Sequence, residues 1–419
     1  MRRFLAVVFA LHAAGAAAQS NDDVRAQARA NKEPLLATLK DLVSIESGSR
    51  DSEGLARLAE LIASRCKALG AQVELVAPGD VYKMEDTPPA IGRMVRATFK
   101  GRGGKTILLI AHMDTVYLRG MLAKQPFRVE GDRAFGLGIA DDKQGIAVIL
   151  HTLAMLRSLG FADYGTITAL VNADEELSSP GSRSLITRLA KEHDATLSFE
   201  ASRHDADKLA LATAGIASVL LQVHGKASHA GAAPERGVNA LYELSHQILQ
   251  MRDLSDPASG VKMNWTVSRA GTNRNVIPAF AEATADVRVL RIGDYDGVEH
   301  AVRERIKKQL VPEAKVELVF ERRRPPLEAA PASSAMARHA QSIYRELGMD
   351  LVVDSVAEGG GTDAAFAALE TKNAVLERFG LRGYGAHSNE DEYVLVSSIE
   401  PRLYLATRLI MDLAAGKVR

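Results

Sequence analysis

The chain has 419 residues, and its 52 Lys and Arg residues balance its 52 Asp and Glu residues, so its formal net charge at pH 7 is zero. This balance gives no sign of a nucleic acid partner or of an anionic membrane surface, and the length favours two domains over one. The single cysteine, Cys66, excludes an intrachain disulfide and is predicted to be a buried thiol.

Residues 1–18 have the pattern of a secretory signal peptide. Arg2 and Arg3 precede a short apolar run, and the small residues at 15–18 suit a cleavage site. The run is too short to span a bilayer, and no later segment is long and apolar enough to do so. We therefore expect an exported protein, periplasmic or secreted, that is not embedded in a membrane.

The mature chain begins with an α/β pattern. Residues 22–70 predict two helices joined by the Ser- and Gly-rich segment 44–52, and residues 71–110 supply two or three strands. The last of these strands is expected at 106–110. Further strands are expected at 166–171 and 196–200, and one helix is expected at 140–159, ended by Gly160. We predict a larger α/β domain, residues 22–213 and 327–419, with a mixed sheet flanked by helices.

Residues 214–326 predict a second domain inserted into the first. Strands are expected at 216–224, 264–269, 281–290 and 314–320, and helices within 234–251 and 298–310. This βαββαβ order is the ferredoxin-like split βαβ arrangement. The basic segment 322–326 then leads back to a helix at 335–347.

Groups that bind divalent metals follow the predicted strands. His112 and Asp114 come after the first strand, Asp174–Glu176 after the second, and Glu200 ends the third. Because open α/β sheets place their sites at the carboxyl ends of parallel strands, we expect these side chains to meet. Imidazole and carboxylate without a nearby cysteine suit zinc or a similar ion.

These positions predict the parts of a two-metal hydrolase. Asp141, in the middle of the series, is the expected bridge, and the expected terminal ligands are His112, Glu176, Glu200 and His387. Asp114 is placed to accept the second ring N–H of His112, and Glu175 is the expected general base.

Each motif also has an ordinary structural interpretation. A lone His-x-Asp is usually a polar pair, Asp141 and Asp142 could cap a helix, and Asp174–Glu176 could be a solvated acidic run. His151 and His193 are expected to be packed or solvated rather than to bind metal. The ordered occurrence of the whole set favours the metal centre.

The chain resembles the dizinc peptidase family of glutamate carboxypeptidases, aminoacylases and dipeptidases. The resemblance rests on segments 112–116, 138–143, 174–176 and 225–231, and within the family it is strongest to the folate-cleaving bacterial glutamate carboxypeptidases, through segments 119–120, 127–132, 264–266 and 359–365. Two positions depart from the pattern: Ala386, where relatives tend to have an aromatic residue, and Gln144, which is commonly glycine.

The resemblance implies two Zn²⁺ per subunit bridged by Asp141, with a cis peptide between Asp141 and Asp142. His112 and Glu200 would bind one ion, and Glu176 and His387 the other. It also implies a homodimer through residues 214–326, in which His229 enters the partner's active site and stabilises the oxyanion. For His229, a solvated residue in a tight turn is the alternative.

A substrate with a free carboxylate needs cationic or amide donors, and Arg suits it best. The candidates are Arg288, Arg324, Asn275 and Lys208, and Arg322 and Arg323 are expected to face solvent. The predicted function is zinc-dependent release of a C-terminal amino acid, glutamate, from N-acyl or peptidyl substrates such as folates. The alternatives are an aminoacylase or dipeptidase, or a non-catalytic exported binding protein.

Overall fold

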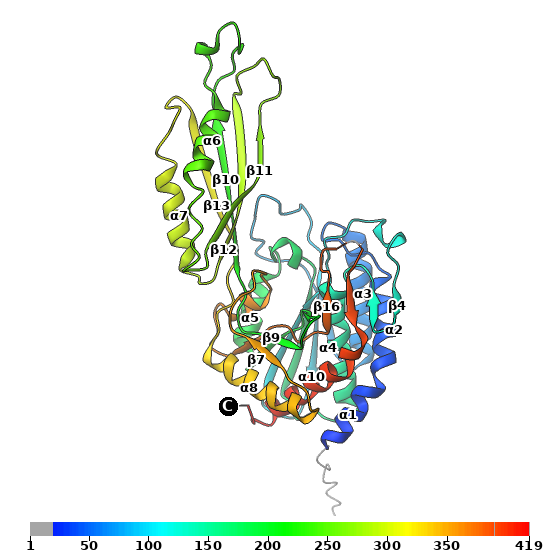
Figure 1. Cartoon of the computed structure of the whole chain (residues 1–419). Coiled ribbons are helices and arrows are strands. Elements are labelled where there is room, and N and C mark those ends of the chain that lie inside the picture. Colours follow the sequence, from blue (N-terminus) through cyan, green and yellow to red (C-terminus); the bar gives the residue numbers. More distant parts are fainter. Residues whose placement is uncertain (1–19, 389, 419) are drawn as a thin grey trace, which may run out of the picture.

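The computed structural model describes residues 20–388 and 390–418, so the predicted signal peptide lies outside the described residues. Figure 1 shows an α/β body from which a smaller unit projects. Within the described ranges, no helix combines the length and the apolarity needed to cross a bilayer.

The body is built on a six-stranded mixed sheet. Its spatial order is β1 (Gln72–Val76), β2 (Met94–Lys100), β6 (Thr166–Asn172), β3 (Thr106–His112), β7 (Ala195–Ser198) and β15 (Ala374–Leu376). The last four strands in this order run parallel, whereas β1 and β2 form antiparallel pairs. The strands predicted at 106–110, 166–171 and 196–200 are therefore adjacent in space.

Both faces of this sheet are buried by helices. In β3, Ile107 and Leu109 belong to one core cluster and Leu108 and Ile110 to another, as expected for a strand covered on both sides. The first cluster includes α1 (Asn21–Ala30), α2 (Lys32–Val43), α3 (Ser52–Ala68), α4 (Gln144–Ser158), α8 (Pro331–Glu346) and α10 (Ile399–Ala414). The second includes α5 (Arg183–Glu192) and α9 (Ala364–Ala368). The buried Cys66 belongs to the first cluster, as predicted.

Two predicted helices differ from their expected bounds. The N-terminal helix breaks at Asn31, whose backbone N–H caps α1 and whose side-chain amide donates to the Gln27 carbonyl at 2.9 Å. Pro34 then lies in the first turn of α2, where its missing N–H costs nothing. The helix predicted from residue 140 instead starts at Gln144, because Asp141 and Asp142 have non-helical dihedral angles.

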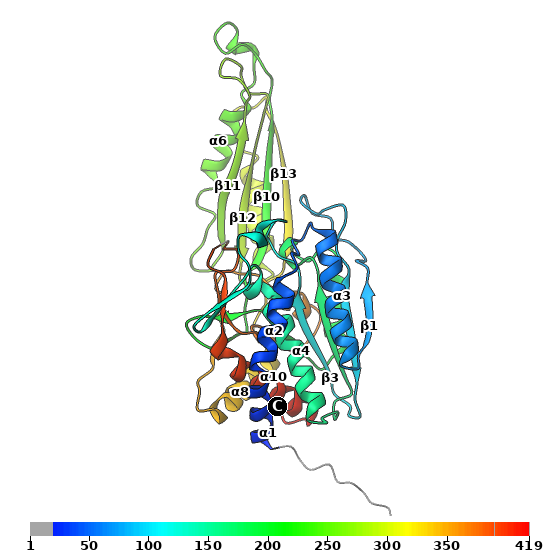
Figure 2. The ribbon, with the colours of Figure 1, turned by 90° about the vertical axis from the view of Figure 1, so that its right-hand side faces the viewer.

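The projecting unit, which we call the insert, has the predicted βαββαβ order. It consists of β10 (Gly215–His224), α6 (Ala240–Gln250), β11 (Lys262–Ala270), β12 (Phe280–Val289), α7 (Asp294–Arg305) and β13 (Lys315–Arg324). Its antiparallel sheet has the order β11-β12-β10-β13 and carries its own apolar core, and Figure 2 shows these strands rising above the body. Arg322–Arg324, expected in a connecting hinge, form the end of β13.

A third sheet supports a C-terminal loop. Its order is β4 (Arg128–Glu130), β5 (Arg133–Phe135), β17 (Tyr393–Leu395), β16 (Arg382–Tyr384) and β8 (Ser202–Arg203). Two further strands, β9 (Lys208–Ala210) and β14 (Val352–Asp354), form a separate parallel pair. The loop between β16 and β17 contains His387 and Glu392, so the pairing of these two strands fixes where both residues leave the sheet.

Candidate metal centre and active site

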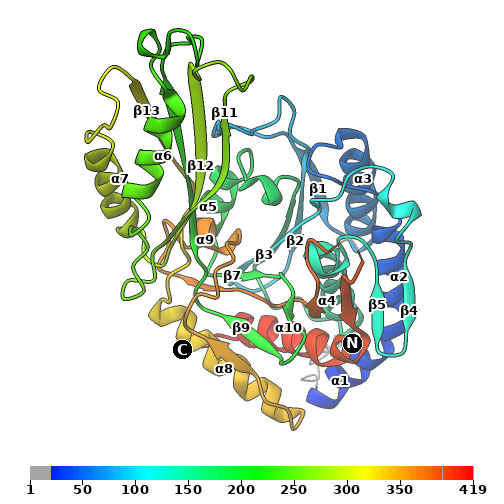
Figure 3. The same ribbon diagram turned by 45° about the horizontal axis from the view of Figure 1, so that its top comes forward.

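The predicted metal ligands lie at the carboxyl ends of the parallel strands. His112 is the last residue of β3, Glu175 and Glu176 form a short turn after β6, and Glu200 follows β7. Since β3 lies between β6 and β7, the three strand ends are neighbours below the insert (Figure 3). The peptide bond between Asp141 and Asp142, in the turn before α4, is cis as the resemblance implied.

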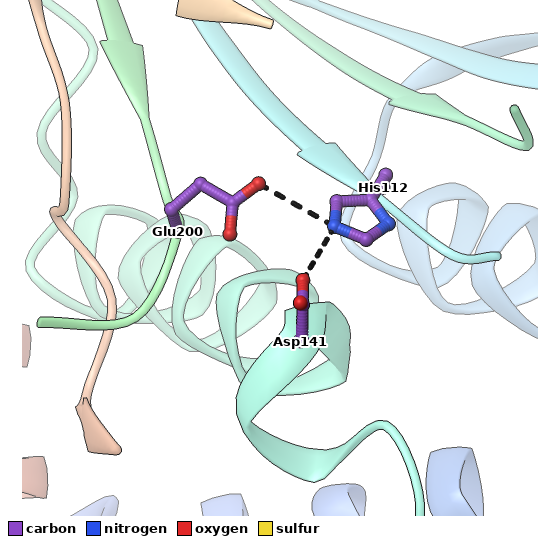
Figure 4. A group of neighbouring side chains, drawn as sticks. All are labelled: His112, Asp141 and Glu200. Atoms are coloured by element: carbon purple, nitrogen blue, oxygen red, sulfur yellow. Dashed lines mark hydrogen bonds and ion pairs between the residues drawn. The ribbon is translucent and has the colours of Figure 1, made fainter. Parts of the chain in front are cut away.

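Asp141 lies between two histidines that are far apart in the sequence, His112 and His387. His112 Nε2 is 2.9 Å from Asp141 Oδ1 and 3.4 Å from Glu200 Oε1 (Figure 4). His387 Nε2 is 3.2 Å from Asp141 Oδ2 and 3.1 Å from Glu176 Oε2. Each histidine therefore faces a different oxygen of Asp141, as a bridging carboxylate requires.

The donor atoms fit two divalent cations. Within each of the two groups the ligand atoms lie within 4.8 Å of one another. Glu176 Oε1 is buried and has no hydrogen-bond partner among the residues that the structure describes, so this oxygen has a lone pair to give. Burial, with the charge of Asp141, raises the pKa of Glu176 to about 7, and hydrogen bonds to Asp141 and Glu176 raise that of His387 to about 11. The site thus favours positive charge, which a divalent ion would supply.

Asp114 connects the first histidine to the loop that contains Glu175. His112 Nδ1 lies 3.0 Å from the Asp114 carbonyl oxygen and 3.3 Å from its carboxylate. That carboxylate accepts the backbone N–H groups of Glu175 and Glu176 and the hydroxyl of Ser49. Asp114 therefore orients the ring and fixes the following loop at the same time.

Glu392, which the sequence interpretation missed, holds the turn that presents Asp141. Its carboxylate accepts backbone N–H groups from Gly138, Ala140 and Asp141 at 2.8–3.1 Å and the Tyr117 hydroxyl at 2.5 Å. Burial raises the pKa of Glu392 to about 7. Its place at the end of an acidic run gave no sign of this role.

The structure explains the departure at Gln144. Its buried side-chain amide donates to Asp142 Oδ1 at 2.6 Å and to the Phe199 carbonyl at 2.9 Å, and its oxygen accepts from Leu381 N. Gln144 thus ties the turn after Asp141 to the end of β7. The candidate metal ligands come together with this larger side chain in place.

Glu175 is buried and forms an ion pair with the insert. Arg324 Nη1 lies 2.8 Å from Glu175 Oε1 and 3.1 Å from Asp363 Oδ1, and Arg324 Nη2 donates to the Glu175 carbonyl. Burial raises the pKa of Glu175 well above its usual value, while the charge of Arg324 acts to lower it.

A cavity of about 570 Å³ lies between the body and the insert and reaches the metal centre. Asp141, Glu175, Glu176, Glu200 and His387 line it from the body. From the insert it is lined by Arg288, Arg323 and Arg324. We call this cavity the catalytic cleft.

The predicted substrate residues divide into two sets. Arg288 and Arg324 line the catalytic cleft, as does Arg323, which was expected to face solvent. Lys208 does not line it and pairs instead with Asp354 and Glu358. Asn275 is an exposed residue of the insert, and its carbonyl accepts from Ala230 N beside His229.

Comparison with known proteins identifies the family. The profile of Peptidase family M20/M25/M40 matches residues 108–412. The chain belongs to this peptidase family. Carboxypeptidase G2 of Pseudomonas sp. (strain RS-16) is 47% identical over 414 residues, which cover 98% of this chain and 97% of that protein.

Solved structures have the same fold. The M20 family metallo-carboxypeptidase Sso-CP2 from Sulfolobus solfataricus has a TM-score of 0.75 and 14% identity, covering 91% of this chain and 99% of its own. The aminopeptidase PepT from Bacillus cereus has a TM-score of 0.74 and 19% identity, covering 92% and 99%. The resemblance, the mixed-sheet α/β fold and the prediction of a metallo-exopeptidase similar to the glutamate carboxypeptidases are confirmed.

Proposed function

We propose that this metallopeptidase uses two zinc ions to release C-terminal glutamate from N-acyl or peptidyl substrates such as folates. One observation carries the proposal: Asp141 joins two ligand groups beside Glu175, in a cleft that also contains Arg288, Arg323 and Arg324. The similarity to carboxypeptidase G2 over nearly the whole chain supports it.

Arg288 is suited to hold a substrate carboxylate. Its Nε and Nη2 donate to Asp286 at 2.9 Å, and its Nη1 donates to the Gly359 carbonyl at 3.1 Å. These bonds fix the plane of the guanidinium, and each terminal nitrogen has a second N–H that can reach into the cleft. A bidentate pair with the carboxylate of the departing amino acid follows.

The ions would supply a water of low pKa and polarise the scissile carbonyl. Glu175 takes the proton of the attacking water on its carboxylate and returns it to the nitrogen of the departing amino acid. The ion pair with Arg324 and the burial of the side chain hold the Glu175 carboxylate in place between these two proton transfers. Asp114 fixes the position of the loop that contains Glu175 and Glu176 relative to His112, because it contacts both.

His229 is prepared to donate a hydrogen bond, but it does not line the catalytic cleft of its own chain. Its Nδ1 accepts from Gly231 N and Ala232 N, both at 3.1 Å, so the proton of the neutral ring is on Nε2. The side chain is exposed beside Asn275 on the insert. We propose that His229 and Asn275 complete the cleft of a partner subunit, where His229 stabilises the oxyanion.

An apolar surface on the insert supports the homodimer. Leu241, Tyr242 and Leu249 of α6 are 40%, 64% and 59% exposed, and Val267 of β11 is 49% exposed. β11 is also an edge strand, with backbone groups available for pairing. Two copies related by a two-fold axis could bury this surface against itself.

The alternative is an aminoacylase or dipeptidase with another amino-acid preference, since N-acetyl-L-citrulline deacetylase of Xanthomonas campestris pv. campestris is 26% identical over 244 residues, covering 56% of this chain and 60% of that protein. The test is hydrolysis of folate, methotrexate, N-benzoyl-glutamate and N-acetyl-glutamate, with the same acyl groups on alanine and leucine. Each reaction is run with zinc and after chelation. Chelator-sensitive cleavage restricted to glutamate supports the proposal, and cleavage indifferent to the amino acid contradicts it.

Export remains a proposal that rests on residues 1–18 alone. We propose that the mature enzyme works in the periplasm or outside the cell. Fractionation of cells that produce the full chain, with detection of the processed N-terminus, tests this directly.

A further inference from the structure

A second cavity between the body and the insert, also of about 570 Å³, is separate from the metal centre. α5 and the end of α9 form its wall on the body, and α7 and the end of β13 form its wall on the insert. Of the residues that line it, only Arg323 and Arg324 also line the catalytic cleft, and none of the candidate metal ligands lines it. We call this cavity the junction pocket.

Arg183, the first residue of α5, is held in the junction pocket by both the body and the insert. Its Nη2 donates to the carbonyls of Ser178 and Arg323. Its guanidinium carbon lies 4.2 Å from the ring centre of Tyr82 and 4.7 Å from that of Phe366. Among the described residues, its Nη1 has no hydrogen-bond partner, so the two N–H groups of this nitrogen can be offered to a ligand.

Two cations of the junction pocket have no carboxylate partner. Arg183 and Arg188 form no ion pair with any residue that the structure describes. Burial, with the charge of Arg324, lowers the pKa of Arg183 to about 10, so a bound anion would stabilise its charged form. The other cations that line the pocket are paired: Arg322 with Asp296 and Glu299, Arg323 with Asp86 and Glu321, Arg324 with Glu175 and Asp363, and Lys191 with Glu370.

Apolar side chains lie around these two arginines. Tyr82, Ile292 and Leu369 are 41%, 49% and 46% exposed, and all three line the junction pocket. Exposed apolar side chains around a cavity of this size are typical of a site for a ligand with an apolar body. The combination of such side chains with unpaired arginines fits an organic anion better than an inorganic ion or a neutral apolar molecule.

We propose that the junction pocket binds an amphiphilic organic anion. Its oxyanion head group, a carboxylate or a phosphate monoester, pairs with Arg183 and Arg188, because arginine binds both groups with the same bidentate geometry. Its apolar body lies against Ile292 and Leu369. The site does not depend on the proposed function. A ligand bound there contacts the body and the insert together, beside the end of β13.

Calorimetric titration of octanoate and of octyl phosphate into the zinc-loaded enzyme tests the site, with 1-octanol as the uncharged counterpart. We expect Arg188→Gln and Leu369→Asp each to weaken binding of the anions about tenfold, because one removes a charged donor and the other places a negative charge against the ligand. Both residues are exposed, so both variants should fold. 1-Octanol should bind the unmodified enzyme at least about tenfold more weakly than the anions. The anion that binds more tightly identifies the head group.

Two exposed residues outside both cavities give matched controls. Arg338→Gln on α8 and Leu310→Asp on the insert should bind the anions as the unmodified enzyme does. Anions that bind at the metal ions or at Arg288 would lose no affinity in Arg188→Gln. Equal affinity in all four variants therefore overturns the inference, and so does the absence of binding of both anions to the unmodified enzyme.

Discussion

Arg324 Nη1 lies 2.8 Å from Glu175 Oε1. The last residue of the insert's final strand thus forms an ion pair with the expected general base, which belongs to the body. Both side chains are buried, so water screens their attraction poorly. Arg324 therefore does more than line the cleft for a substrate, the role that the sequence suggested. Its charge also lowers the pKa of Glu175, against the effect of burial.

Replacing Arg324 by Gln should move the acid limb of the pH profile of kcat/KM to higher pH. The cation lowers the pKa of Glu175 against the effect of burial, so without it Glu175 stays protonated to a higher pH. The ionised, active base then appears only at that higher pH. Arg322→Gln is the control, because Arg322 pairs with Asp296 and Glu299 away from the cleft. An Arg324→Gln profile that overlays the unmodified one would refute the coupling.

Mixing two inactive variants tests whether His229 acts in the partner subunit. Glu175→Gln and His229→Ala should each bind zinc and lose at least a hundredfold in turnover, because one removes the base and the other an oxyanion donor. Dissociated and reassembled in equal amounts, they should recover about a quarter of the normal activity, since half of the dimers are mixed and each mixed dimer has one complete site. If His229 serves its own chain, no site is complete and the mixture stays inactive.

Replacing Glu392 by Gln should weaken metal binding about 10–100-fold. The amide loses acceptor capacity for the backbone N–H groups of Gly138 and Ala140, so the turn that presents Asp141 is held less firmly. Competition with a chromogenic chelator measures the affinity. The neighbouring exposed residue gives a control, Asp391→Asn, which should bind metal as the unmodified chain does.

His151 should make the fold less stable in mild acid. Its Nε2 contacts the Thr38 hydroxyl and its Nδ1 contacts Asn31 Oδ1, both at 2.9 Å, and burial lowers its pKa to about 4. Between pH 6.5 and pH 4 the unfolded chain binds a proton that the folded chain does not, so stability falls as the pH drops through this window, by up to about 3 kcal/mol.

Urea unfolding at a series of pH values checks the effect of His151. His151→Gln should flatten the dependence between pH 6.5 and pH 4, whereas the exposed His300→Gln should leave it unchanged. A slope that is the same in His151→Gln and in the unmodified protein would show that other groups control acid stability.

The sequence was sufficient for the strands of the body's sheet up to β7, although not for β15, and for the predicted order of the candidate metal-binding groups along the chain. β3 and β6 are short apolar runs with a polar group at the carboxyl end, and parallel pairing then brings those ends together whatever the rest of the chain does. The insert was predictable for a similar reason, because its strands and helices alternate with clear turns between them.

The sequence did not predict features in which a side chain has several possible partners and only the folded structure decides between them. Asn31 ends α1 through its own cap, and Pro34 cannot lie inside a continuous helix, but the helical pattern of the flanking residues hid this break. Glu392 looked like one acid among several until the fold of its loop gave it four donors. Lys208 could have faced a substrate, but Asp354 and Glu358 come close to it only when β14 pairs with β9.

The loop between β16 and β17 contains His387, so the second candidate metal group can form only late in the synthesis of the chain. Among the described residues, the two candidate ligand groups draw on segment 112–200 and on His387, which is synthesised only after the whole insert and most of the body. A nascent chain emerging from its N-terminus can thus form the strands of the body, but it cannot close the second metal group until its last few dozen residues arrive. Chains truncated before His387 would lack the second ligand group and should be without peptidase activity, and uptake of a second ion would report that this loop has been made and folded.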